Sequence, residues 1–272
     1  MSDGLGYPLR ARIDCAADWM NVRPLDPGDP FFTDTVKRCV DINRAIGDEC
    51  YTFYNFFSPF NIVRACDVLT ENALQGRTWD ETVMAHLREN PDALRHALNV
   101  IAQDLAVLAR RVISEGGCLG IYQSVQGAEK DRMSAGEYES VVRPSDMIVI
   151  NAFNAASPYN ILHMCSWAGY PNHLSYWKDY PCRVKNWGVG IEGLSLSGGV
   201  SFFGEDTVLL GGMVVTLIQD WRLSMVLMST LPLLAKAVHL DPALMASPLI
   251  TTIVDICSLL VLFAVATEVL HV

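Results

Sequence analysis

Short apolar runs alternate with longer segments of helical periodicity along the first three quarters of the chain. Five apolar or aromatic runs predict strands, at residues 51–57, 118–122, 160–165, 183–187 and 207–210. Four segments with apolar residues at helical spacing predict helices, at residues 33–46, 91–115, 145–155 and 194–203. This alternation is typical of a parallel α/β protein, either an open sheet or a barrel. In both architectures ligands bind just beyond the C-terminal ends of the strands.

The clearest helix follows Asn90. Asn is a favoured cap, and Pro91 suits the first helical position because its missing N–H would have no partner there. One apolar stripe then continues until Gly116-Gly117, through Leu94, Leu98, Ile101, Leu105, Leu108 and Val112.

Two further signals place turns and helix starts. Ser58-Pro59 predicts that the first strand ends in a loop, and Ser134 with Glu137 has the spacing of a capping box. Ser145 is a candidate start for the helix that runs to Ala155.

After residue 210 the composition changes from that of a soluble protein to that of a membrane segment. Only six charged residues remain in 211–272, namely Arg222, Lys236, Asp220, Asp241, Asp255 and Glu268. Residues 247–267 are apolar apart from hydroxyls and Asp255, and about 20 such residues can cross a hydrocarbon core. Residues 223–235 form a second candidate span, interrupted by Pro232. The alternative is a buried helix that packs on the α/β part.

Net charge and cysteine usage exclude some classes of function. The 272-residue chain has a formal charge of −10, which argues against nucleic acid as a partner because nucleic-acid binding needs a basic surface. Its eight cysteines are scattered, without a CxxC pair, and the N-terminus is polar. We therefore expect a reducing, cytoplasmic location for the α/β part.

His163-Met164-Cys165 is the sharpest candidate for chemistry. Residues two apart on a strand point to the same side, so the imidazole and the thiol would project together at the strand's end. Both are good zinc ligands, and zinc can lower the pKa of a thiol. The alternative is a half-buried histidine beside an inert core cysteine. A catalytic zinc needs about three protein ligands, and the candidates for a third are Cys182, Cys118 and Glu192.

Several motifs in order resemble the uroporphyrinogen decarboxylase superfamily over about residues 19–212. They are Phe56-Phe57-Ser58-Pro59-Phe60, Gly117-Cys118-Leu119-Gly120-Ile121, Asn160-Ile161-Leu162-His163-Met164-Cys165, Tyr180-Pro181 with Asn186-Trp187, and Leu210-Gly211-Gly212. The resemblance implies a (β/α)₈ barrel with its site at the mouth. The superfamily contains cofactor-independent porphyrinogen decarboxylases and cobamide-dependent methyltransferases. In the methyltransferases a His-x-Cys and a distant Cys hold zinc; His163 and Cys165 match the first two ligands and favour that branch.

The chain departs from this family at both ends. Family members begin with two further strands, one with an arginine-rich motif in the decarboxylases, and end with a strand that carries a Gly-Cys zinc ligand. We therefore expect an incomplete TIM-barrel-like domain of about five strands, since a full barrel takes about 250 residues. Its open strand edges would invite pairing with another chain, for example with a second copy in a homo-oligomer.

Residues 223–266 resemble a second family, the last two transmembrane helices of MgtE magnesium transporters. The matching segments are Pro232-Leu233-Leu234, Asp241-Pro242-Ala243 and Ala246-Ser247-Pro248-Leu249-Ile250-Thr251-Thr252-Ile253-Val254-Asp255. The resemblance implies that Asp255 lies in a pore and binds hydrated magnesium. That family needs five such helices, normally in a dimer, so a pore would require other chains.

We therefore predict two domains, 1–212 and 213–272, and three alternatives for function. As an enzyme, the chain would be a zinc methyltransferase or a related lyase, with Gln123, Gln126 and Trp187 lining a pocket for a small-molecule substrate and a cobamide-carrying corrinoid protein as partner. As a transporter, it would contribute Asp255 to a magnesium pore, with membrane association through the C-terminal segment. As a fusion of two fragments, it would have neither activity.

Overall fold

The computed structural model describes residues 7–65, 68–166 and 169–210. The chain divides into two units, residues 1–212 and 213–272, and the description that follows concerns the first. Within the described residues, no helix has the length and apolar character to cross a bilayer. The predicted spans at 223–235 and 247–267, and Asp255 with them, lie outside the described residues.

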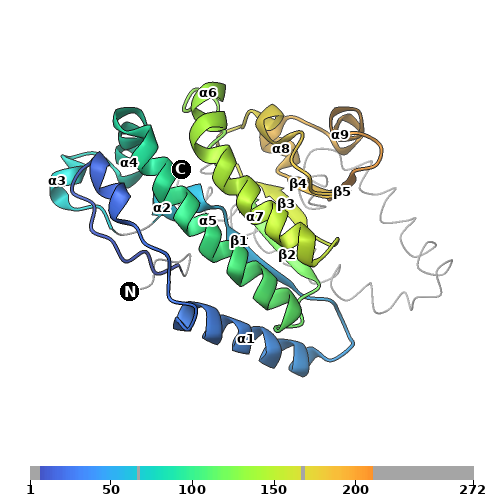
Figure 1. Cartoon of the computed structure of the whole chain (residues 1–272). Coiled ribbons are helices and arrows are strands. Elements are labelled where there is room, and N and C mark those ends of the chain that lie inside the picture. Colours follow the sequence, from blue (N-terminus) through green and yellow to red (C-terminus); the bar gives the residue numbers. More distant parts are fainter. Residues whose placement is uncertain (1–6, 66–67, 167–168, 211–272) are drawn as a thin grey trace, which may run out of the picture. The chain divides into compact units, whose positions relative to one another are not determined.

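Five parallel strands form a single sheet in the described part (Figure 1). The strands are β1 (Phe53–Phe57), β2 (Gly120–Val125), β3 (Ile161–Met164), β4 (Val184–Trp187) and β5 (Val208–Leu210). Each strand pairs with the next one in sequence, in the order β1-β2-β3-β4-β5. This confirms the predicted α/β class with a parallel sheet and all five predicted strands.

Helices and helical turns connect the strands. The α-helices are α1 (Pro30–Ile46), α2 (Pro59–Ala65), α3 (Glu71–Leu74), α4 (Trp79–Glu89), α5 (Pro91–Ser114), α6 (Ala135–Glu137), α7 (Arg143–Ala156), α8 (Val189–Glu192) and α9 (Leu196–Phe203). Two 3₁₀ helices, η1 (Ala16–Asn21) and η4 (Leu174–Trp177), and one π-helical turn, η2 (Tyr138–Val142), complete the set in the described residues.

Local capping explains where several helices start. The Asn90 side chain accepts a hydrogen bond from the Ala93 N–H and Pro91 takes the first position of α5, as the sequence predicted. The predicted start at Ser145 is wrong by two residues, because η2 leads directly into α7 at Arg143. The predicted loop after Ser58 is also wrong: Pro59 opens helix α2, since proline fits a first helical position.

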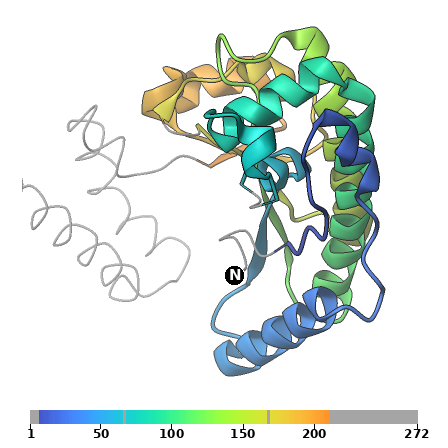
Figure 2. The same cartoon turned by 90° about the vertical axis from the view of Figure 1, so that its left-hand side faces the viewer.

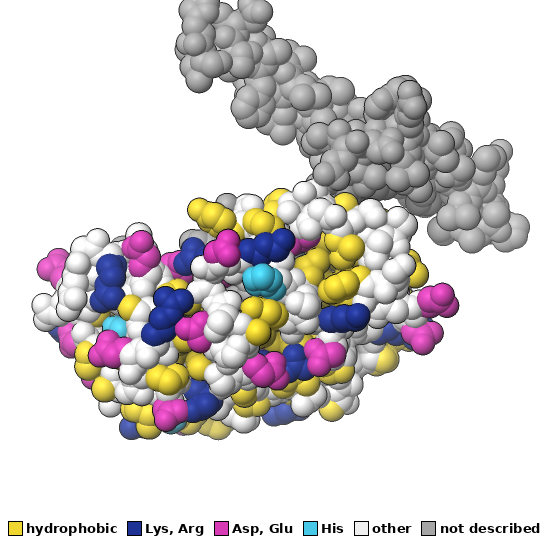
Figure 3. Space-filling model, turned by 90° about the horizontal axis from the view of Figure 1, so that it is seen from above, with side chains coloured by type: hydrophobic (Ala, Val, Ile, Leu, Met, Phe, Trp, Pro, Cys, Tyr) yellow, Lys and Arg dark blue, Asp and Glu magenta, His cyan; other side chains and the backbone are white. Residues whose placement is uncertain are grey.

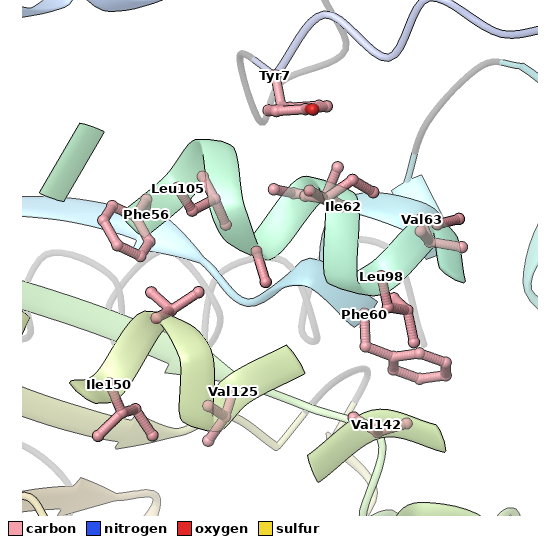
Figure 4. Close-up of a cluster of buried hydrophobic side chains, with 14 of the residues drawn as sticks. Tyr7, Phe56, Phe60, Ile62, Val63, Leu98, Leu105, Val125, Val142 and Ile150 are labelled. Carbon is pink, nitrogen blue, oxygen red and sulfur yellow. The ribbon is translucent and has the colours of Figure 1, made fainter. Parts of the chain in front are cut away.

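Helices α5 and α7 pack on one face of the sheet and bury most of the core (Figures 1 and 2). Figure 4 shows Phe56 and Val125 of the strands, Leu98 and Leu105 of α5 and Ile150 of α7 as members of one cluster of buried hydrophobic side chains. Leu98, Val125 and Ile150 have no exposed surface. Burial on this scale stabilises the layer by about 1.5–3 kcal/mol for each large apolar side chain.

On the strands' other face most side chains are half-buried or exposed, although Ser124 of β2 is buried. Val208 and Leu210 on β5 are 48% and 43% exposed, whereas Leu209 between them packs against the core. Tyr122, His163 and Asn186 share this second face, which we call the open face.

The connection between β3 and β4 is less helical than the expected alternation. Among its described residues it contains only the 3₁₀ turn η4, whose Trp177 is fully buried. The described residues between the two strands, 165–166 and 169–183, are therefore mostly loop, and they begin at the C-terminal end of β3 with the predicted zinc ligand Cys165.

Candidate functional site

His163 and Cys165 lie together at the C-terminal end of β3. His163 is the third of the four strand residues and Cys165 follows directly, so alternation places both side chains on the open face. Both are half-buried. The structure thus brings together the two residues that the sequence singled out, at the end of the sheet where parallel α/β proteins bind ligands.

Asn186 fixes the orientation of the His163 ring. Asn186 lies level with His163 on the neighbouring strand β4, and His163 Nδ1 is 2.5 Å from Asn186 Oδ1. The Tyr122 hydroxyl donates to the same oxygen at 2.9 Å, and its ring stacks on the imidazole with centroids 5.4 Å apart. The Asn186 amide donates in turn to the Leu210 carbonyl at 2.6 Å. His163 is therefore held at one edge by Asn186 of β4 and on one face by Tyr122 of β2, while Leu210 of β5 holds Asn186.

Gln126 contacts the thiol. Its Nε2 donates a hydrogen bond to Cys165 Sγ at 3.4 Å. Burial raises the pKa of the Cys165 thiol, but hydrogen bonds from Gln126 and from His163 in its protonated form, together with the positive charge of that form, lower the pKa below its ordinary value. A thiol of lowered pKa has more of the thiolate form, which is the form that binds metals and attacks electrophiles.

A buried ion-pair cluster lies on the far side of Gln126. Arg64 Nη1 donates to Glu129 Oε1 at 2.7 Å, and Arg64 Nε donates to Asp80 Oδ1 at 2.6 Å. Arg64 Nη1 also lies 3.5 Å from Gln126 Oε1. A cleft of about 510 Å³ opens beside this cluster, lined by Arg64, Thr78, Trp79, Asp80, Glu81, Arg132 and Tyr170. Gln126 therefore connects a polar cleft with charges of both signs to the Cys165 thiol.

Two of the three candidates for a third zinc ligand are wrong. Cys182 precedes β4 and Cys118 precedes β2, so both lie at the N-terminal end of the sheet, opposite Cys165. Glu192 on α8 lies at the correct end, but it accepts hydrogen bonds from Ser166, at 2.6 Å, and from the backbone and side chain of Asn172. Within the residues that the structure describes, no three His, Cys, Asp or Glu side chains form a group that could hold a metal.

The three predicted pocket residues do not line one pocket, because they lie on different faces of the sheet. Gln126 contacts Cys165, as described above. Gln123 is fully buried and lies on the helix-covered face, since its neighbours Tyr122 and Ser124 point to the open face. Trp187 also faces the helices, where its Nε1 donates to the Leu194 carbonyl at 2.8 Å and its ring packs on Phe203.

Sequence reasoning missed Asn186 and Tyr122 as site residues. Each lies on the same face of the sheet as His163, but only the strand pairing shows that Asn186 is level with His163 on β4 and that Tyr122 lies diagonal to it on β2, level with Ile161. Figure 3 shows the molecule from above, with basic, acidic and hydrophobic side chains interspersed. On the described part of that face neither sign of charge forms a continuous patch.

Comparisons with known proteins support both resemblances. The family model MgtE, described as a divalent cation transporter, matches residues 187–265, which is less than half of the chain. Among solved structures, a methyltransferase from Methanosarcina mazei is similar with 16% sequence identity and a TM-score of 0.53, covering 70% of this chain and 54% of that one. The chain thus spans about half the length of that protein, and the likeness at this identity shows the fold alone. No curated protein matches the chain.

Proposed function

We propose that this chain is a methyltransferase-like protein that binds zinc through His163 and Cys165 at the mouth of a partial (β/α)₈ barrel. The sequential order of the five parallel strands supports the barrel, because neighbours in a barrel sheet are neighbours in sequence. The observation that carries the proposal is the pairing of His163 and Cys165 at the C-terminal end of β3, with a separate hydrogen-bond partner for each.

The residues fit zinc in donor chemistry. Imidazole nitrogen and thiolate sulfur are preferred zinc donors, and zinc ligands are usually held by outer hydrogen bonds. Asn186 is such a partner for His163, and Gln126 for Cys165. The described residues supply two protein ligands, and a catalytic zinc with three would take one more from elsewhere, in this chain or another.

The chain's own residues have distinct roles in this proposal. His163 and Cys165 hold the ion, and Gln126 stabilises the thiolate of Cys165 by donating to its sulfur. When bound, zinc would lower the pKa of a substrate thiol and thereby make it a nucleophile toward a methyl group. The cleft beside Arg64 suits a polar small molecule, since its wall offers both donors and acceptors. A corrinoid protein is the methyl donor that the resemblance implies.

Zinc content tests this proposal. The full chain, purified in detergent and exposed to zinc, is expected to retain stoichiometric zinc after dialysis, measured by mass spectrometry. Cys165→Ser and His163→Gln should each lose it. Cys182→Ser is the matched control, because Cys182 is a buried thiol at the opposite end of the sheet. Equal zinc retention by Cys165→Ser and by the unchanged chain would refute the site.

A second function is favoured by the MgtE match to residues 187–265. Here the C-terminal segment would cross a membrane and contribute Asp255 to a magnesium path built from several copies of the chain. An ionisable residue within an apolar span usually serves such a path. Asp255→Asn should then abolish magnesium flux into liposomes that contain the full chain. Asp241→Asn is the control and should retain more magnesium flux than Asp255→Asn. If neither zinc retention nor magnesium flux is found, the chain is a fusion without either activity.

A further inference from the structure

The hydrogen bonds around Asn186 determine which nitrogen of His163 carries the proton. A backbone carbonyl can only accept, so the Asn186 amide nitrogen must be the atom that faces the Leu210 carbonyl at 2.6 Å. The amide oxygen therefore faces the Tyr122 hydroxyl and His163 Nδ1, at 2.9 and 2.5 Å. An amide oxygen cannot donate, so both of these neighbours must donate to it.

We propose that Asn186 is a positioning residue that holds neutral His163 in the Nδ1–H tautomer and leaves Nε2 with its lone pair. This rests on the proposed function insofar as the lone pair is meant for zinc; the tautomer itself does not depend on zinc. Stacking of the Tyr122 ring on the imidazole resists rotation of the ring, which would exchange the two nitrogens. The hydroxyl of Tyr122 holds the Asn186 oxygen from the other side.

The arrangement suits a metal ligand better than an inert core histidine. A histidine that ligates a metal through one nitrogen almost always donates from the other, and loss of the outer partner typically lowers metal affinity by about 10- to 100-fold. The same fixed tautomer would also let Nε2 accept a proton from a thiol. Asn186 lies 23 residues from His163 along the chain, so this support depends entirely on the pairing of β3 with β4.

Nitrogen NMR of the imidazoles tests the inference directly. The full chain labelled with ¹⁵N, in detergent and freed of metal by a chelator, is studied at a pH where His163 is neutral. Long-range proton–nitrogen spectra distinguish the protonated ring nitrogen from the unprotonated one. The His163 signals are identified by their loss in His163→Gln. We expect His163 to be predominantly the Nδ1–H tautomer, Asn186→Leu to shift it toward Nε2–H, and Tyr122→Phe to preserve it, since Asn186 still accepts.

Zinc titration of the same variants separates this inference from the proposed function. A shifted tautomer together with a 10- to 100-fold loss of zinc affinity in Asn186→Leu supports both. A shifted tautomer in a chain that binds no zinc supports the role of Asn186 and refutes the zinc site. An Nε2–H tautomer in the unchanged chain overturns the inference whatever the zinc result, and this measurement does not require Asn186→Leu to fold.

Discussion

Replacement of Asp146 by Asn should remove a large part of the pH dependence of this protein's stability. Asp146 lies on α7 with no exposed surface. Its Oδ2 accepts hydrogen bonds from the hydroxyls of Tyr138, at 2.8 Å, and Tyr180, at 2.9 Å, while its buried Oδ1 has no hydrogen-bond partner among the described residues. Burial raises the pKa of Asp146 to about 7, although the two tyrosine hydroxyls and the charge of Arg143 act in the opposite direction.

The raised pKa of Asp146 determines whether folding stability rises or falls with pH. In the unfolded chain the pKa of an aspartate is near its ordinary value of 3.8, so Asp146 ionises less readily in the folded protein than in the unfolded chain. The stability that Asp146 contributes is complete below about pH 4 and is lost as the pH rises to about 7. The difference between the pKa of 3.8 in the unfolded chain and about 7 in the fold corresponds to about 4 kcal/mol of folding stability in total, of which about 3 kcal/mol is lost between pH 5 and pH 8.5.

Urea unfolding of the full chain, followed by tryptophan fluorescence, measures this effect because Trp177 Nε1 donates to the Tyr138 hydroxyl at 2.6 Å. The free energy of unfolding is compared at pH 5 and pH 8.5. Relative to Asp146→Asn, the unchanged chain should lose about 3 kcal/mol over this interval. Asp179→Asn is the control: its side chain is 69% exposed and pairs with Arg143, which lowers its pKa, so it stays ionised throughout. Identical pH profiles for Asp146→Asn and the unchanged chain would refute the reasoning.

Two further predictions, at Gly120 and at Asn90, concern the free energy of unfolding and are tested by urea unfolding. Gly120→Ala should destabilise the chain by about 3 kcal/mol or more, because a β-carbon there would overlap the carbonyl oxygen of Tyr159. Gly136→Ala is the control: a β-carbon there meets open space, so stability should change by less than about 0.5 kcal/mol. Asn90→Ala should cost about 1 kcal/mol, because the Ala93 N–H loses its 3.2 Å hydrogen bond to the cap. An unchanged midpoint for Gly120→Ala, or a stabilised Asn90→Ala, would contradict these expectations.

Helix α4 begins at a local signal that the residues alone contain. Thr78 and Glu81 form a capping box at the start of α4, where the Glu81 side chain accepts from the Thr78 N–H at 2.8 Å. The same pattern at Ser134 and Glu137 predicts a capping box, and the structure confirms it at α6. Helix α4 was therefore predictable from the residues alone, because a cap depends only on groups three positions apart.

The sequence by itself determined the five strands, the long capped helix α5 and the projection of His163 and Cys165 to one side of β3. These depend on periodicity and on neighbours a few residues apart, which the chain fixes before it folds. Tertiary structure alone decided that Asn186 and Tyr122 meet His163, that Gln126 meets Cys165, and that Cys118 and Cys182 lie at the wrong end. Those relations depend on which residues of different strands lie beside one another in the sheet, either level or diagonal. Strand register is set by packing of the whole layer against α5 and α7, and no short stretch of sequence contains it.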